Sequence, residues 1–396
     1  MRTLLAAFAC LSFSGVWACS SDSSTDKLAG RLSPEGGSSG TEASQTAAAG
    51  AGGTNAPTPE PPPGAGNVPG SNSPSSEDPN VVGLANPGAT GGPSSGGVTA
   101  DAGSPSPTRG VCPPGPFAAS PLPAGATPQP ICTGLTFTEG AVWFQQLNTL
   151  FFSDFQIGDA ASNFNGRILS YTPGGQCQEF IADAGTNGLA IGLDGSLLGA
   201  RHRDQTLTRF DLTTKQTSVL VPDFGGAKFN SPNDIAVRSD GNLYFTDPNY
   251  MLGNRTSQLP TQAYRRDPNG VLSVIDPAAM PNGITLSPDE THLYLSHLGG
   301  PNNVLRYDVD ASGAVSNPQP FANVGSDGMA IDCAGNLYTT TQGNVRVYAP
   351  DGTLLGTLPA AGAANVAFGG PERKTLYITA TATLFAVELA IPGLPY

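Results

Sequence analysis

The chain has few of the residues that mark several large classes of protein. It carries 18 Lys and Arg residues against 31 Asp and Glu residues, so its formal net charge of −13 offers nothing to neutralise nucleic acid phosphates. Its cysteines show no close pairs of the kind that bind zinc. The apolar run Leu4 to Val16 is too short to span a membrane, and no window has a competing helical periodicity. We therefore expect no nucleic acid partner, no zinc cluster and an all-β fold.

Aromatic residues are absent from Ser20 to Gly110, where Gly, Pro, Ser, Ala and Thr predominate. Such a segment cannot bury enough apolar surface to offset the entropy lost on ordering. Residues 19–110 are therefore predicted to be a disordered tether. It could act as a docking segment, but its composition favours a plain spacer.

The first eighteen residues have the pattern of an export signal, with Arg2 ahead of the apolar run. Val16 to Cys19 resembles a bacterial lipobox, which predicts a lipoprotein-type signal over 1–18 and lipidation of Cys19. The alternative is ordinary signal cleavage with Cys19 incidental. An acylated N-terminus would give the tether an anchor, so we expect an exported lipoprotein on a bacterial membrane, facing the periplasm or the cell surface.

Four cysteines fall in the remaining part of the chain, and an exported protein can oxidise them. Four cysteines allow three pairings. Cys112 and Cys132 bracket a Pro-rich segment, and a disulfide between them is the first expectation. Cys177 and Cys333 lie in predicted hairpin turns of different units, and their state is left open.

An oxygen-bearing side chain recurs ten or eleven residues before a Leu that opens a β-prone run. The six pairs are Glu139/Leu150, Asn187/Leu197, Asn233/Leu243, Asn282/Leu293, Asp327/Leu337 and Asn365/Leu376. Successive Leu residues are 47, 46, 50, 44 and 39 positions apart. A period of about 45 residues with several short strands per unit is typical of β-propeller blades. Residues 111–396 are therefore predicted to form a six-bladed β-propeller.

Each unit repeats a strand, a tight turn and further strands. In the third unit, Ile235–Val237 is followed by Asp240-Gly241-Asn242 and then by Leu243–Thr246, a strong hairpin pattern. The first, fourth and sixth units have one more residue in the turn, which accounts for their spacing of eleven. A third strand is expected in most units and an outer fourth strand in each blade, such as 166–171 and 178–181 in the first.

Equivalent positions of successive blades surround the propeller axis, so the six oxygen-bearing side chains are predicted to form a ring. Each Asn or Asp alone could simply cap a turn. Glu139 has no such turn preference, and six residues in phase favour a shared site. One Glu, one Asp and neutral amides suit a hard divalent cation, with Ca²⁺ preferred over Zn²⁺, Mg²⁺ or Mn²⁺.

Five short motifs occur in order between Gly134 and Leu384 and together resemble the gluconolactonase/regucalcin family of six-bladed propeller lactonases. They are Thr138–Trp143, Asn230–Asp234, Phe245–Pro248, Pro281–Ile284 with Ser287–Asp289, and Ser326–Met329. The resemblance implies a metal at the channel mouth held by Glu139, Asn282 and Asp327. It makes Asn233 a fourth ligand or a substrate contact.

The resemblance also implies hydrolysis of sugar lactones, with the metal polarising the carbonyl and Asp327 acting as base for the water or as a ligand alone. This chain departs from the family at three places: Ala141 replaces a frequent Pro, 201–205 replaces a Glu-His-Gly element, and His297 replaces an acid. Asn187, His202 and His297 are the further candidates for substrate contact. His202 could instead be a buried structural residue, and His297 an acid/base group or a relaxed position.

The sequence therefore predicts a metal-dependent, monomeric sugar lactonase. A related ester or phosphotriester hydrolase is one alternative. A non-catalytic ligand-binding propeller with a structural metal is the other, because propellers support many functions.

Overall fold

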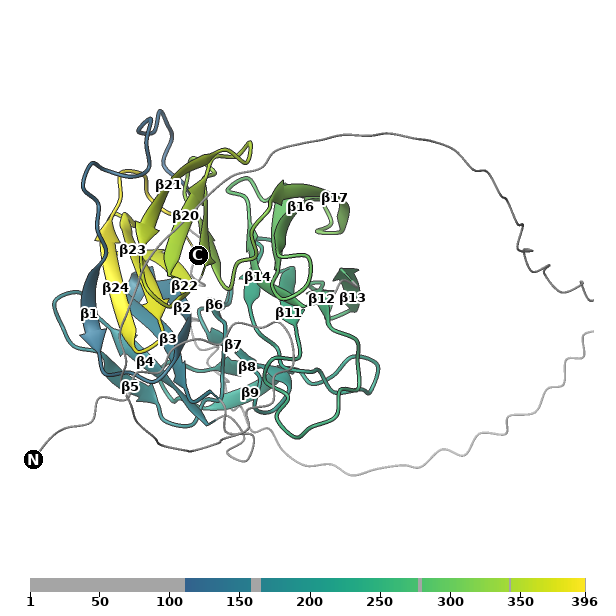
Figure 1. Ribbon diagram of the computed structural model, residues 1–396. Helices are drawn as coiled ribbons and strands as arrows, with labels where there is room; N and C mark the ends of the chain where they lie inside the picture. Colours follow the sequence, from purple (N-terminus) through teal and green to yellow (C-terminus); the bar gives the residue numbers. More distant parts are fainter. Residues whose placement is uncertain (1–110, 158–164, 277–279, 342, 396) are drawn as a thin grey trace, which may run out of the picture. The chain divides into compact units, whose positions relative to one another are not determined.

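Six four-stranded antiparallel sheets follow one another along the chain, and each is one blade of a β-propeller (Figure 1). The computed structural model describes residues 111–157, 165–276, 280–341 and 343–395. The first strand of each blade is buried along its whole length, whereas the fourth strand is largely exposed. The first strands therefore surround the channel, and the predicted six-bladed fold is confirmed.

The strand bounds follow the repeating pattern of the sequence. Blade one has β2 (Thr138–Phe144), β3 (Thr149–Phe155), β4 (Gly166–Tyr171) and β5 (Gln178–Ile181), with a short 3₁₀ turn η1 (Gln145–Leu147). Blade two has β6 (Leu189–Ile191), β7 (Leu197–Arg201), β8 (Thr206–Phe210) and β9 (Thr217–Val221). Blade three has β10 (Ile235–Val237), β11 (Leu243–Asp247), β12 (Gln262–Arg266) and β13 (Leu272–Asp276).

The remaining blades have the same order except at the end of the chain. Blade four has β14 (Pro281–Leu286), β15 (His292–His297), β16 (Asn303–Val309) and β17 (Val315–Ala322). Blade five has β18 (Met329–Ile331), β19 (Leu337–Thr341), β20 (Asn344–Tyr348) and β21 (Leu354–Pro359). Blade six has β22 (Ala363–Gly369), β23 (Thr375–Ala380), β24 (Thr383–Glu388) and, as its outer strand, β1 (Gln129–Thr133).

The N-terminal strand closes the propeller. β1 pairs antiparallel with β24, and Figure 1 shows these two strands, blue and yellow, side by side in blade six. Blade six has only three strands of its own, so without β1 the edge of β24 would present unpaired backbone groups. In the sequence this segment is marked only as Pro-rich, and its role in closure was not predicted.

Both disulfides tie the N-terminal segment to the propeller. Cys112 is bonded to Cys333, with their Cα atoms 5.5 Å apart, and Cys132 is bonded to Cys177, at 6.2 Å. The expected Cys112–Cys132 bond is therefore wrong. Cys132 belongs to β1, which lies against blade six and reaches the β4–β5 turn of blade one. The second disulfide thus joins the last blade to the first.

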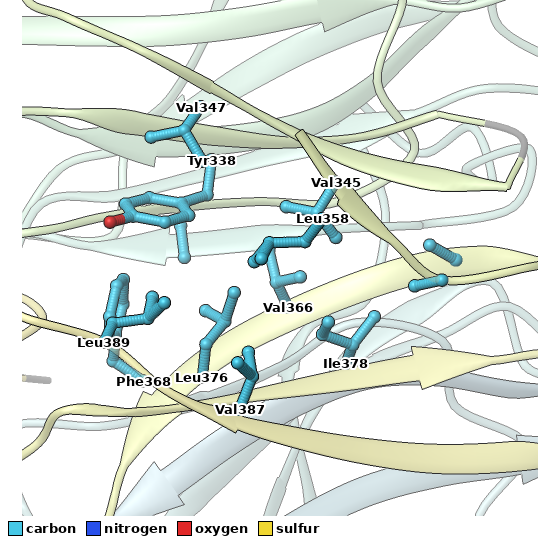
Figure 2. Packing of buried hydrophobic residues seen from close by; sticks show 13 residues of the cluster. Tyr338, Val345, Val347, Leu358, Val366, Phe368, Leu376, Ile378, Val387 and Leu389 are labelled. Carbon is cyan, nitrogen blue, oxygen red and sulfur yellow. The ribbon is translucent and has the colours of Figure 1, made fainter. Parts of the chain in front are cut away.

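The blades are held together by apolar side chains that interdigitate between neighbouring sheets. Figure 2 shows this between blades five and six, where Tyr338, Val345 and Val347 face Val366, Leu376 and Ile378. Each fully buried aliphatic or aromatic side chain contributes about 1.5–3 kcal/mol relative to its exposed state. This packing fixes the angle between sheets and so the positions of the inner strands.

The described residues include no helix of the length and apolarity that crossing a membrane requires.

Loss of the closing disulfide is expected to weaken the last blade first. A Cys132→Ser/Cys177→Ser variant loses the cross-link over a separation of 45 residues, which stabilises the folded state by about 2–4 kcal/mol. Calorimetry should show a Tm lower by roughly 5–15 °C. Hydrogen exchange should be faster at the β24 amides that pair with β1. An unchanged Tm with unchanged exchange in β24 would contradict this account of closure.

Candidate functional site

The ring predicted from the sequence is present in five blades. In each of these blades, one residue of the inner strand pairs with the repeated Leu of the second strand, and the oxygen-bearing residue lies four positions before that partner. In blade two, for example, Ile191 pairs with Leu197, and Asn187 lies four positions before Ile191. The same holds in blades one, three, four and five. The five ring residues are Glu139, Asn187, Asn233, Asn282 and Asp327.

In blade six, the predicted ring residue is wrong by one position. Phe368 pairs with Leu376, which leaves a hairpin loop of residues 369–375, two longer than the loop 192–196 of blade two. Counting four positions back from Phe368 gives Ala364. The backbone agrees, because Gly328 donates to the Ala364 carbonyl as Gly188 donates to that of Asn233. Asn365 instead accepts a hydrogen bond from the Val366 amide, a local structural role.

Glycine after a ring residue lets the inner strands approach one another closely. A Cβ on Gly140 would lie 1.9 Å from the Asn187 carbonyl oxygen, and one on Gly283 would lie 2.6 Å from that of Asp327. In both cases the glycine of one blade lies against the carbonyl group of the ring residue in the next blade. No side chain fits there without moving the backbone, so the glycines bring the ring residues of neighbouring blades together.

Hydroxyl groups on the second strands fix the backbone of the ring. Ser153 donates to the Asn187 carbonyl at 2.6 Å, Ser296 to that of Ser326 at 2.7 Å, and Thr340 to that of Ala364 at 2.7 Å. Each bond crosses from one blade to the next. Because these groups are buried and the bonds satisfy the carbonyls, they hold the first strands in register around the axis.

Three carboxyl groups gather where the inner strands converge. Glu139 and Asp327 lie near enough to affect the pKa values of one another, the charge of Asp234 acts on Glu139, and the charge of Asp327 acts on Asp234. Burial, then the charges of Asp327 and Asp234, raise the pKa of Glu139 well above its usual value. Burial also raises the pKa of Asp234 to about 7 and that of Asp327 to about 6. Three acids in one buried place repel one another, and a cation there would relieve that repulsion.

Asn282 has the geometry of a ligand. It is 2% exposed, and its side chain lies near enough to Asp327 and Tyr250 to act on the pKa values of both. Its Oδ1 atom is buried without a hydrogen-bond partner. A buried amide oxygen without a donor is unfavourable unless a cation or water completes it. With the oxygens of Glu139 and Asp327, this atom gives a donor set that fits a hard divalent cation.

Among the described residues, no group of three or more His, Cys, Asp or Glu side chains is arranged to hold a metal ion. The candidate site differs from such clusters because amide oxygen supplies part of the donor set. The ligand roles of Glu139, Asn233, Asn282 and Asp327 stay predictions. Asn187 and Asn233 are buried at 5% and 6% exposure, and their proposed substrate contacts are also predictions.

His202 lies after β7 and is completely buried. Its ring packs edge-on against Phe155 with centroids 4.9 Å apart, and Arg255 donates to its carbonyl oxygen at 3.0 Å. This environment fits the alternative that His202 is a buried structural residue. A contact with substrate remains a prediction that would need the covering side chains to move.

His297 ends β15 and is 1% exposed. Its Nδ1 lies 3.0 Å from Asn303 Oδ1, and its Nε2 lies 3.2 Å from Asp276 Oδ2, which also accepts from the Tyr307 hydroxyl. Burial favours neutral imidazole, but the hydrogen bonds to Asp276 and Asn303 outweigh it and raise the pKa of His297. The residue therefore links blades three and four, and its substrate role stays a prediction.

A narrow cavity continues from the ring into the channel. Its volume is about 50 Å³, and small side chains such as Ala190, Ala236 and Ala330 line it together with Asp234. One water needs roughly 10–15 Å³ of such space. The channel can therefore hold a few waters, and a larger molecule must bind at the mouth above the ring.

Two residues of the site were not predicted. Asp234 follows Asn233 directly and reads as a turn residue, yet its carboxylate accepts the Ile284 amide of blade four at 3.2 Å. Four other blades have glycine directly after the ring residue, namely Gly140, Gly188, Gly283 and Gly328. Asp234 replaces that glycine in blade three, and this departure from the repeat is the feature of the sequence that could have marked it. Tyr250 lies in a long loop with no repeat pattern to mark it.

The family model for the SMP-30/Gluconolactonase/LRE-like region matches residues 137–382. A gluconolactonase of Zymomonas mobilis is 32% identical over 285 residues, covering 65% of this chain and 80% of the relative. The pentonolactonase XacC of Haloferax volcanii is 27% identical, covering 62% and 82%. A solved gluconolactonase structure from Xanthomonas campestris is 29% identical with a TM-score of 0.61, covering 71% and 96%.

The buried carboxyl groups predict a specific pH dependence in protein freed of divalent cations. The folded-state pKa of Asp234, about 7, lies above its value in the unfolded chain, so the unfolded state ionises first as pH rises. The stability from this group is full below about pH 4 and is lost up to about pH 7. Urea midpoints in chelator should therefore fall between about pH 4 and about pH 7, and less so for Asp234→Asn. Equal falls in both proteins would contradict the assignment.

Proposed function

Because the chain belongs to the SMP-30/Gluconolactonase/LRE-like family, we propose that it is a sugar lactonase with a divalent cation at the channel mouth. It is a hydrolase of carboxylic ester bonds, as its gluconolactonase relatives indicate. The particular lactone and the particular ion are open, and Ca²⁺ is the preferred ion on the chemistry of the ligands.

The observation that carries this proposal is the donor set of Glu139, Asn282 and Asp327. Two carboxylates and a buried amide oxygen without a hydrogen-bond donor meet in a space that also contains Asp234. The raised pKa values of Glu139 and Asp327 indicate that these groups are not stable as bare anions there. When bound, a divalent cation would supply Lewis-acid polarisation of the lactone carbonyl.

The proton transfers of the reaction are assigned to the protein's own side chains. Asp327, the ring residue of blade five, is the proposed base, and the bound cation beside it would set its pKa. It takes a proton from the water that attacks the carbonyl carbon. As the ring C–O bond breaks, the proton passes to the departing oxygen, and the product is the open-chain hydroxy acid.

The ring also determines where the substrate lies. Since the channel below has room for only a few waters, a lactone must lie across the mouth, above Asp327. Asn233 and Asn187 occupy the ring positions of blades three and two and are proposed to donate to sugar hydroxyls. Their amide groups are suited to this because each can both donate and accept.

Replacement of one carboxylate should separate the roles of charge and fold. Glu139→Gln should reduce lactone hydrolysis by about 100-fold or more, because several kcal/mol of charge stabilisation depend on the ion. The same variant should be more stable than the wild type in chelator, since one of three repelling acids is gone. Activity on sugar lactones and Tm would be measured with and without chelator.

Glu179→Gln is the matched control, because Glu179 lies on the outer strand of the same blade and is about half exposed. Chelator-insensitive hydrolysis, or wild-type rates for Glu139→Gln, would overturn the proposed mechanism. A bound ion with no turnover of any sugar lactone would favour a non-catalytic binding propeller instead.

We further propose that residues 1–18 direct export, that Cys19 carries a lipid, and that 19–110 tethers the catalytic domain to a bacterial membrane. These residues lie outside the described part of the chain, so the support is the sequence pattern alone. In a bacterial host, Cys19→Ser should abolish labelling with a radioactive fatty acid and release the protein from membranes. Cys10→Ser, within the apolar run, should label normally. Labelling of Cys19→Ser would refute the lipid anchor.

A further inference from the structure

Two arginine side chains lie on the mouth face of blade two. The mouth face is the one at which the inner strands begin and the second strands end, because these strands are antiparallel. β7 ends at Arg201, and Asn187, the ring residue of this blade, donates from its backbone amide to the Ala200 carbonyl at 2.9 Å. The turn that follows β7 and contains Arg203 therefore lies directly beside the ring.

Both guanidinium groups are paired with carboxylates of their own blade. Arg201 Nη1 lies 2.8 Å from one carboxylate oxygen of Asp204, and Arg203 Nε lies 3.3 Å from the other. Arg203 also forms an ion pair with Asp183. Two positive charges therefore face two negative charges, and this cluster offers no net positive charge to a substrate.

Packing fixes the two arginines in this paired arrangement. Their side chains are only 13% and 16% exposed. Arg201 Nε donates to the Ala184 carbonyl at 2.6 Å. A Cβ on Gly185 would lie 2.6 Å from Arg203 Cβ and 3.1 Å from its Cδ, so the Arg203 side chain lies along this glycine. Neither guanidinium group can turn toward the mouth without breaking several of these contacts.

The other basic side chains that the structure describes on this face also have partners within the protein. Arg167 pairs with Asp154 at 2.9 Å, and Lys228 donates to the Pro222 carbonyl beside the outer strand of blade two. Arg255 donates to backbone carbonyls of blade two. No Lys or Arg occurs in the short segments of the propeller outside the described residues, which are 158–164, 277–279 and 342. The mouth therefore has carboxyl groups in the ring and no basic group directed at them.

Resting on the proposed function, we propose that the site selects lactones without a charged substituent, and that Asp183 and Asp204 determine this selectivity. They neutralise the two arginines beside the ring. A phosphate or sulfonate group on the sugar would then meet the ring carboxyl groups without a compensating positive charge. Like charges brought together on binding are unfavourable, and such repulsion excludes one substrate without improving the contacts of another.

The test compares kcat/KM of the full-length protein for glucono-1,5-lactone, its neutral 6-O-methyl derivative and its anionic 6-phosphate. The methyl derivative controls for added bulk at that position. The wild type should hydrolyse the phosphate at least about tenfold less efficiently than the methyl derivative. Added salt should reduce the difference, because it screens the repulsion. Equal kcat/KM for these two lactones, or a difference that salt leaves unchanged, would overturn the inference.

Variants with the same change in charge assign the selectivity to particular carboxylates. Asp204→Asn releases both arginines and should raise the ratio of phosphate to methyl-lactone hydrolysis by about threefold or more. Asp183→Asn, which releases Arg203 alone, should raise it less. Asp194→Asn is the matched control, because its carboxylate pairs with Arg209 at 3.1 Å in the hairpin of the same blade, at the end away from the ring. This control should keep the wild-type ratio.

Hydrolysis of the neutral lactone reports that each variant is folded. No rise in the ratio for either Asp204→Asn or Asp183→Asn, or an equal rise in Asp194→Asn, would overturn the inference while leaving the proposed function intact. A wild-type protein that hydrolyses none of the three lactones would overturn both.

Discussion

Burial of three carboxyl groups close to the propeller axis is the constraint on which this structure depends. Glu139, Asp234 and Asp327 come from blades one, three and five, and none of them could be brought together by a single strand or hairpin. The fold achieves it by converging six strands on one axis, with glycine at the points of closest approach and hydroxyl groups to satisfy the backbone. Such an arrangement is unfavourable in isolation, and the proposed cation would make it favourable.

The rest of the propeller holds the inner strands in place around these buried carboxyl groups. β1 closes blade six, and the Cys132–Cys177 and Cys112–Cys333 bonds tie the N-terminal segment to blades one and five. The β4–β5 and β18–β19 turns that carry Cys177 and Cys333 lie at the ends of the strands away from the ring. Closure is therefore covalent at one face, whereas the loops at the other face are free to form the mouth.

Much of the fold could be predicted because its information is periodic. The spacing of Leu150, Leu197 and the later Leu residues gives the number of blades. The ring residues follow from the same repeat, because each lies four positions before the inner-strand partner of that Leu. Where the period is broken, prediction was wrong: two added residues in the 369–375 loop moved Asn365 out of the ring and placed Ala364 there. The role of β1 and the disulfide pairing depend on contacts between the two ends of the chain, which no local pattern encodes.

The same distinction applies to the site. Glu139, Asn282 and Asp327 could be found from their phase in the repeat and from family motifs. Asp234 could not, because it resembles a turn residue. Its carboxylate accepts from the Ile284 amide of blade four, so its place becomes visible only when the blades are arranged around the axis.

The central claim is that the converging oxygens of blades one, four and five hold a divalent cation. Anomalous diffraction from crystals of the protein grown with Mn²⁺ tests it directly. The account predicts one strong anomalous peak among the side-chain oxygens of Glu139, Asn282 and Asp327. A map with no peak at that place, or with the ion bound only elsewhere, would contradict it.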